Sequence, residues 1–236
     1  MVPPFVRALL LAAAATGVPA APALAAPALA DTDAQRLAPY FAPATATPAK
    51  PDADGFLRRW LVLEPFAKPN RTNQGFTRAY VRDAFAQTTP PGPALAVPRA
   101  GQTVTIAGQR LQWHALDSQL FDAKLFNFAQ ALGKTTYGVI FRVTTVVVSD
   151  REIPEAHLAV GSNSASIWWL NGREATALFG DRRMVMDDGV SPAITLHKGR
   201  NVLQGAIING PGLSDFSARF VDAAGRPITD LSITLR

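Results

Sequence analysis

Apolar positions recur with different periods along the chain, and each period predicts an element. An apolar run over 55–63 predicts a strand that ends before Pro65. Between Asn73 and Phe85 the apolar residues fall at i, i+4, i+5, i+8 and i+9, which predicts a helix capped by Asn73. Over 120–132 they fall at i, i+4, i+7 and i+11, which predicts a second helix capped by Asp117 or Ser118.

From Gly138 onward the pattern changes to short β-branched and apolar runs. Turn signals separate these runs, at Gly161-Ser162, Asn171-Gly172, Asp188-Gly189, Lys198-Gly199, Asn209-Gly210 and Gly225. Asn171-Gly172 is typical of a two-residue hairpin turn with positive φ at both positions. Strands spaced by roughly 8–12 residues indicate an antiparallel β-sandwich or jelly roll. We therefore expect a mainly β domain over 55–236, decorated by two short helices.

The N-terminal part has a different composition. Arg7, an Ala/Leu-rich run over 8–18 and Ala28-Leu29-Ala30 predict a secretory signal peptide over 1–30, although Ala23-Leu24-Ala25 offers the same cleavage pattern. The apolar run is too short to span about 30 Å of hydrocarbon. Residues 31–54 are rich in Ala, Pro and Thr, which predicts an extended linker. We expect a periplasmic or secreted chain with no membrane segment after cleavage.

Composition excludes several classes of protein. The 236 residues are 48% hydrophobic and 17% charged, which excludes wholesale disorder. The absence of Cys excludes disulfides, thiol catalysis and iron–sulfur clusters. The net charge is +5, but the arginines are scattered as singles and pairs, such as Arg58-Arg59 and Arg182-Arg183. Without a basic stripe, no nucleic-acid partner is expected.

The inventory of reactive residues favours no enzyme class. His114, His157 and His197 do not stand at metal-ligand spacing, and 161–165 only approaches the G-x-S-x-G nucleophile pattern. Asp187-Asp188-Gly189 fits a turn better than a catalytic carboxylate pair. No cofactor is expected, and a structural calcium ion at a turn aspartate is a weaker alternative.

Trp168-Trp169 is the most suggestive pair for a ligand, since indole faces stack on sugar rings. Successive strand residues face opposite ways, so either one indole is partly exposed or both are buried in a two-sided strand. The candidate ligand-binding residues are Trp113, His114, Trp168, Asn171, Arg182, Arg183 and Asp187. No catalytic or metal-binding residue is assigned.

Several segments together resemble a known family. They are LAVGSNSASIWWLNGRE over 158–174, ITLHKGRNVL over 194–203, FSARFVD over 216–222, GRPI over 225–228 and WLVLEPF over 60–66. In this order they resemble the galactose-binding-like jelly roll of secreted bacterial glycosidases and carbohydrate esterases, with Glu64 where many members have Gly. The likeness is greatest to a segment of proteins labelled acetylxylan esterases, in which a separate domain is implied to hydrolyse the ester.

Three functions remain open at this point. The first is an exported, non-catalytic carbohydrate-binding or accessory module that contacts a polysaccharide or oligosaccharide and acts with a hydrolase on another chain. The second is a small acetylxylan-type esterase that uses a serine and one of the three histidines. The third is a structural periplasmic protein with no sugar ligand.

Overall fold

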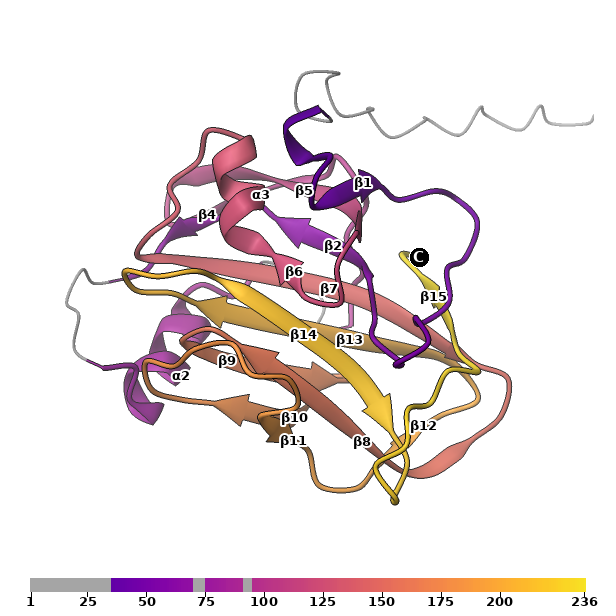
Figure 1. Ribbon diagram of the computed structural model, residues 1–236. Helices are drawn as coiled ribbons and strands as arrows, with labels where there is room; N and C mark the ends of the chain where they lie inside the picture. Colours follow the sequence, from indigo (N-terminus) through magenta and orange to yellow (C-terminus); the bar gives the residue numbers. More distant parts are fainter. Residues whose placement is uncertain (1–34, 70–74, 91–94) are drawn as a thin grey trace, which may run out of the picture.

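Two antiparallel sheets pack face to face in the computed structural model, which describes residues 35–69, 75–90 and 95–236 (Figure 1). The large sheet has ten strands in the order β1-β5-β2-β7-β13-β9-β10, with β4 beside β5 and with β3 and β15 beside β7. The small sheet has five strands in the order β11-β8-β14-β6, with β12 beside β8. The predicted antiparallel β-sandwich is therefore confirmed.

The strands of the large sheet are β1 (Phe41–Pro43), β2 (Arg59–Leu63), β3 (Phe66–Ala67), β4 (Thr103–Ile106), β5 (Gln109–Ser118), β7 (Val139–Ser149), β9 (Ala165–Leu170), β10 (Arg173–Leu178), β13 (Gly199–Ile208) and β15 (Ser232–Thr234). The strands of the small sheet are β6 (Ala123–Lys124), β8 (Ile153–Ser162), β11 (Gly189–Val190), β12 (Ile194–Leu196) and β14 (Asp215–Val221). Helix α2 (Arg78–Gln87) lies between β3 and β4, and helix α3 (Leu125–Ala131) follows β6.

The main core fills the space between the two sheets. Alternate residues of each strand point inward, and Trp60, Trp168 and Phe216 meet there. The Phe216 ring lies 5.1 Å from the Trp60 ring and 5.3 Å from the Trp168 ring, measured between centroids. Burial of these large apolar surfaces is the principal force that holds the two sheets together.

A second core lies on the outer face of the large sheet. There α2 buries Val81, Ala84 and Phe85 against strand residues such as Ile140 and Ile208. The side chain of Thr77 caps α2 by accepting a hydrogen bond from the backbone N–H of Tyr80. Asn73, the predicted cap, lies outside the described residues. Helix α2 covers only part of this face.

The second predicted helix is shorter than expected, because the stretch 120–132 contains two elements, β6 and α3, although its apolar spacing is that of one helix. Residues 123–124 form β6, whose Lys124 pairs with Asp215 of β14. The side chains of Leu120 and Phe121 are 40% and 43% exposed, so the first turn of the predicted apolar stripe does not face the core. Pairing with β14 decides the conformation here, and α3 begins only at Leu125.

The described part of the predicted linker, residues 35–54, packs on the sandwich. Phe41–Pro43 form β1 at the edge of the large sheet, and Leu37 and Phe41 are buried. Pro43 is tolerated there because an edge strand leaves one row of N–H groups unpaired. The backbones of Ala49 and Ile233 exchange two hydrogen bonds. The composition of this segment thus predicted an extended linker incorrectly, because it missed these long-range contacts.

The predicted signal peptide, residues 1–30, lies outside the described residues. In the ranges that the structure describes, no helix is long and apolar enough to cross a membrane. Within the same ranges, no group of three or more His, Asp or Glu side chains is arranged to hold a metal ion.

Candidate functional site

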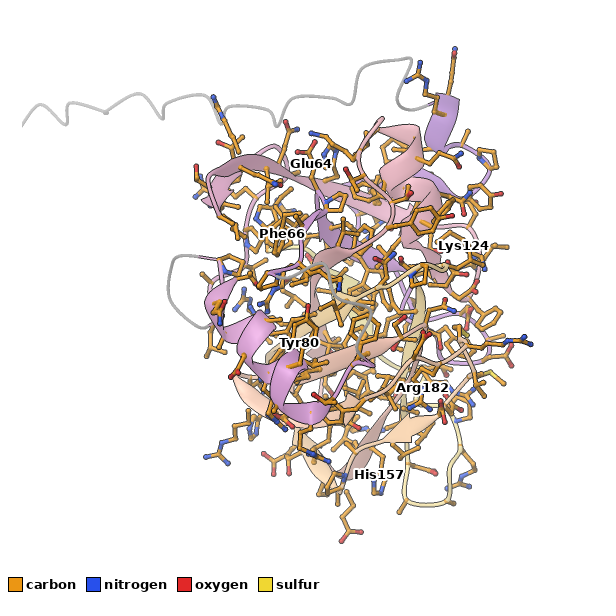
Figure 2. All side chains as sticks on the ribbon, turned by 90° about the vertical axis from the view of Figure 1, so that its left-hand side faces the viewer. Glu64, Phe66, Tyr80, Lys124, His157 and Arg182 are labelled. Carbon is orange, nitrogen blue, oxygen red and sulfur yellow. The ribbon has the colours of Figure 1, made fainter. Side chains whose placement is uncertain are left out.

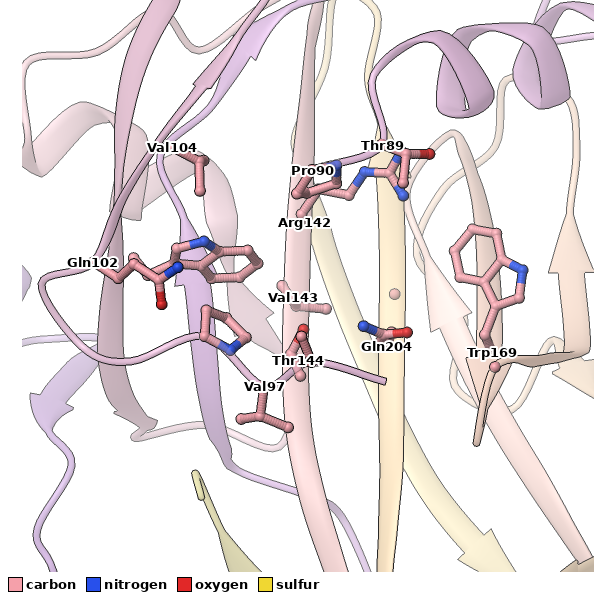
Figure 3. A pocket seen from close by; sticks show the side chains of 15 residues that line it. Thr89, Pro90, Val97, Gln102, Val104, Arg142, Val143, Thr144, Trp169 and Gln204 are labelled. Carbon is pink, nitrogen blue, oxygen red and sulfur yellow. The ribbon is translucent and has the colours of Figure 1, made fainter. Parts of the chain in front are cut away.

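The candidate site is a pocket of about 380 Å³ on the outer face of the large sheet (Figure 3). It lies beside the end of α2, where Thr89 and Pro90 line it, and the β4–β5 hairpin forms another wall. The polar side chains that line it are Thr89, Gln102, Arg142, Thr144 and Gln204, and the two indoles are those of Trp113 and Trp169.

Strand register aligns the floor of the pocket. Gln204 of β13 pairs with Thr144 of β7 on one side and with Trp169 of β9 on the other. The three residues therefore form one row across the sheet, with their side chains on the same face. Figure 3 shows Gln204 between Thr144 and Trp169 in this row. No single one of these residues indicates a site by its position in the sequence. Strand pairing brings their side chains together.

Two indoles give the pocket its aromatic surface. Trp169 is half-buried, whereas Trp113 is 4% exposed and presents only a small part of its ring. Val97, Pro98 and Val104 add apolar surface beside them. An apolar lining with a few polar groups is the usual composition of a small-molecule site.

Arg142 is the charged residue of the pocket. Its side chain projects from the fourth position of β7, and only 8% of Arg142 is exposed. Its Nη2 donates to the Phe85 carbonyl oxygen at 2.5 Å and lies 3.5 Å from Thr88 Oγ1. Its guanidinium carbon lies 5.3 Å from the Phe85 ring centroid and 6.0 Å from that of Trp169. Burial lowers the pKa of Arg142 to about 10.

Trp113 is the one predicted ligand residue that lines this pocket. Trp168 is 0% exposed, and its Nε1 donates to Ser166 Oγ at 3.1 Å. Its indole is packed against Trp60 and Phe216 between the sheets and is not available to stack on a ligand. The structure therefore removes Trp168 from the candidate site.

His114 faces away from the pocket. Its Nε2 lies 3.5 Å from Glu64 Oε1, and its ring packs edge-on against Phe128 of α3. Burial alone would raise the pKa of Glu64, but hydrogen bonds from His114, Lys134 and the backbone N–H of Gln112 lower it below its ordinary value. These contacts hold the His114 ring in the interior beside Glu64, away from the pocket.

Arg182, Arg183 and Asp187 lie in the loop between β10 and β11 and do not line the pocket. Arg182 pairs with Asp188, and Asp187 pairs with Arg219. Arg183 is exposed. In Figure 2, Glu64, which contacts His114, lies well apart from Arg182. The predicted set therefore does not converge on one site.

Asn171 acts as a turn former, as its Asn-Gly sequence predicts. The φ angles of Asn171 and Gly172 are 50° and 78°, which confirms the predicted positive values. Asn171 Oδ1 accepts from the backbone N–H of Val202 at 2.8 Å, and Asn171 Nδ2 donates to Asn201 Oδ1 at 3.0 Å. Asn171 and His197 line a second pocket, whose described lining contains no Phe, Tyr or Trp.

Sequence reasoning missed Trp169, Arg142, Thr144, Gln102 and Gln204. Strand alternation had already separated the two faces of the Trp168-Trp169 pair, but it could not assign which face was open. Arg142 carried a clearer signal, since it is the one charged residue of the eleven-residue strand VIFRVTTVVVS. A lone cation inside an apolar strand is a candidate for function, because burial of an unpaired charge is costly.

The sequence matches no protein-family model and no curated protein. Among solved structures, the chain is similar to a PA14 sugar-binding domain from an RTX adhesin, with 12% identity, a TM-score of 0.44, and coverage of 74% of this chain and 96% of that chain. It is also similar to the GH31 α-xylosidase Xac1773 from Xanthomonas citri, with 9% identity and a TM-score of 0.29. That likeness covers 82% of this chain and 19% of the xylosidase. Neither likeness is strong enough to indicate a function for this chain.

Proposed function

We propose that this chain is a carbohydrate-binding module that holds an oligosaccharide in the pocket on the outer face of the large sheet. The row formed by Trp169, Gln204 and Thr144 carries this proposal, because it sets an indole beside an amide and a hydroxyl. An indole face offers apolar surface to the C–H side of a sugar ring, while amides and hydroxyls exchange hydrogen bonds with its hydroxyl groups.

The size of the pocket agrees with a small ligand. Its volume of about 380 Å³ lies within the roughly 300–1,000 Å³ of typical small-molecule sites. Gln102 adds a second amide on the side of the β4–β5 hairpin. A sugar in this position would contact polar groups from several strands at once.

The wider role that we propose is that of an exported accessory module. In this proposal residues 1–30 direct the chain out of the cytoplasm, and the module acts with a polysaccharide-degrading hydrolase on another chain. The resemblance of 158–174 to galactose-binding-like jelly rolls supports this role. Fold likeness alone does not specify a ligand, so the test concerns the pocket itself.

The contacts of the histidines do not favour the esterase alternative. That activity needs a serine hydroxyl within hydrogen-bond reach of an imidazole. His157 Nδ1 instead lies 2.9 Å from the backbone oxygen of Ser191, and His114 faces Glu64. Hydrolysis of an aryl acetate that is abolished in His114→Ala would contradict the binding-module proposal.

Isothermal titration of the mature chain with a panel of plant and bacterial oligosaccharides tests the proposal. We expect Trp169→Ala to weaken binding by about tenfold or more, because loss of a stacking contact costs on the order of 1–3 kcal/mol. Tyr137→Ala is the matched control, since Tyr137 is 54% exposed and does not line the pocket. Unchanged affinity in Trp169→Ala, or no binding by any member of the panel, would overturn the proposal.

A further inference from the structure

We propose that the pocket recognises an acidic sugar, a uronic acid whose carboxylate pairs with Arg142. This inference rests on the proposed carbohydrate-binding function and names the class of sugar. It follows from three observations about Arg142: its burial, its missing counter-ion and its position beside Trp169.

Arg142 is a buried cation with no carboxylate partner among the described residues. In the described ranges no ion pair involves it, and no Asp or Glu lines the pocket. Two of the stretches that the structure does not describe, 70–74 (NRTNQ) and 91–94 (PGPA), contain no acidic residue in the sequence. A buried charge is costly unless it is paired, so an anionic ligand would complete this site.

The guanidinium of Arg142 also has an N–H group that makes no hydrogen bond to the described residues. This group is Nε–H, and it is buried. Nη2 is engaged by the Phe85 carbonyl and, at the longer distance of 3.5 Å, by Thr88. A guanidinium binds a carboxylate best through two parallel N–H donors. A carboxylate that reaches the guanidinium would neutralise this buried charge, which a single neutral hydroxyl would not.

A purely structural role for Arg142 explains part of this geometry. Its contact with Phe85 places a positive charge at the C-terminal end of α2, where the helix dipole is negative. That contact explains the direction of Nη2. It explains neither the unpaired Nε–H nor the placement of the cation on the floor of a pocket.

The placement of Arg142 beside Trp169 fits a ligand whose sugar ring carries a carboxylate. The guanidinium carbon lies 6.0 Å from the centroid of the Trp169 ring. In a uronic acid the carboxyl carbon is bonded directly to the sugar ring, so one ligand residue can stack on Trp169 while its carboxylate reaches Arg142. At neutral pH both groups are ionised, because the pKa of Arg142 is about 10 and that of a carboxyl group is about 4.

Calorimetric titration with matched ligands tests the inference. The probes are oligogalacturonate and oligoglucuronate of three residues, their methyl esters and the neutral oligosaccharides of the same linkage. We expect the wild-type chain to bind one of the two acids at least about tenfold more tightly than its ester, the gain expected for one charge-assisted pair. The ester comparison needs no variant, so it remains valid even if changes at Arg142 disturb folding.

Variants then assign the preference to one side chain. Arg142→Gln is expected to bring the acid and its ester to equal affinity, and Arg142→Lys to keep a smaller preference, since lysine retains the charge without the fork. Arg200→Gln is the matched control, because Arg200 is exposed and lies outside the lining of the pocket. Trp169→Ala should weaken the acid and the ester alike. A preference that persists in Arg142→Gln would overturn the inference.

The outcomes separate this inference from the proposed function. Equal binding of acids, esters and neutral sugars by the wild-type chain would overturn the acidic-sugar inference and leave carbohydrate binding intact. Absence of binding by every sugar would overturn both. Acetate or benzoate bound as tightly as the uronate would mean that a carboxylate alone is recognised, and this result would also contradict the inference.

Discussion

The two faces of the large sheet differ most clearly at two adjacent residues. Trp168 and Trp169 have the same side chain, but Trp168 is 0% exposed between the sheets, whereas Trp169 is half-buried in the pocket wall. The inner indole contacts Trp60 and Phe216. The outer indole has Gln204 beside it in the sheet and Arg142 nearby. Neighbouring positions of one strand therefore place one indole in the core and the other in the pocket wall.

The inner face is filled by close complementarity, and the outer face is not. Gly205 of β13 lies opposite Trp168, and a Cβ atom added there would come within 2.5 Å of the indole. On the outer face, α2 and the β4–β5 hairpin cover the sheet without closing over Gln204 and Trp169. The difference between the two faces shows that the exposed surface of this sheet depends on the elements that pack against it.

Trp168→Ala should give the largest effect on stability. Removal of a buried tryptophan costs about 3–5 kcal/mol in the free energy of unfolding, through lost burial and the cavity that remains. Trp169→Ala should cost about 1 kcal/mol or less, because its ring is half-buried. Urea unfolding followed by circular dichroism measures both. Equal losses in the two variants would contradict the proposed division between the faces.

Gly205→Ala should give the next largest effect. The added methyl group has no space beside the Trp168 ring, and overpacking of this kind costs about 1–3 kcal/mol. Gly212→Ala is the control, because no atom lies within 4 Å of the position of its added Cβ. Thermal unfolding of the two variants makes the comparison. A Gly205→Ala protein as stable as the control would show that the inner face is looser than described.

Arg82→Gln should have the smallest effect. Arg82 of α2 pairs with Glu174 of β10 at 2.7 Å, and both side chains are more than a third exposed to solvent. The hydrogen bond from Arg82 also lowers the pKa of Glu174. Exposed pairs contribute about 0.5 kcal/mol, so the loss should be near that value and should shrink in 0.5 M NaCl. A loss of several kcal/mol would mean that this pair anchors α2.

Long-range packing explains where sequence-based expectation was wrong. The Ala- and Pro-rich stretch around Phe41 predicts an extended linker, but pairing with Leu116–Ser118 of β5 makes it an edge strand. The apolar spacing over 120–132 predicts one helix, but pairing with β14 makes a strand of Ala123–Lys124. In both places the partner lies far away in the sequence, so a local pattern carries no information about it.

Local sequence patterns determined the mainly β character of this protein, the turn at Asn171-Gly172 and the opposite orientation of Trp168 and Trp169. These properties depend on residues a few positions apart, so periodicity and φ preferences are sufficient. Tertiary structure alone decided which indole faces the pocket and which residues stand beside it. Trp113, Thr144, Trp169 and Gln204 come from four strands, and only the register between those strands brings their side chains together.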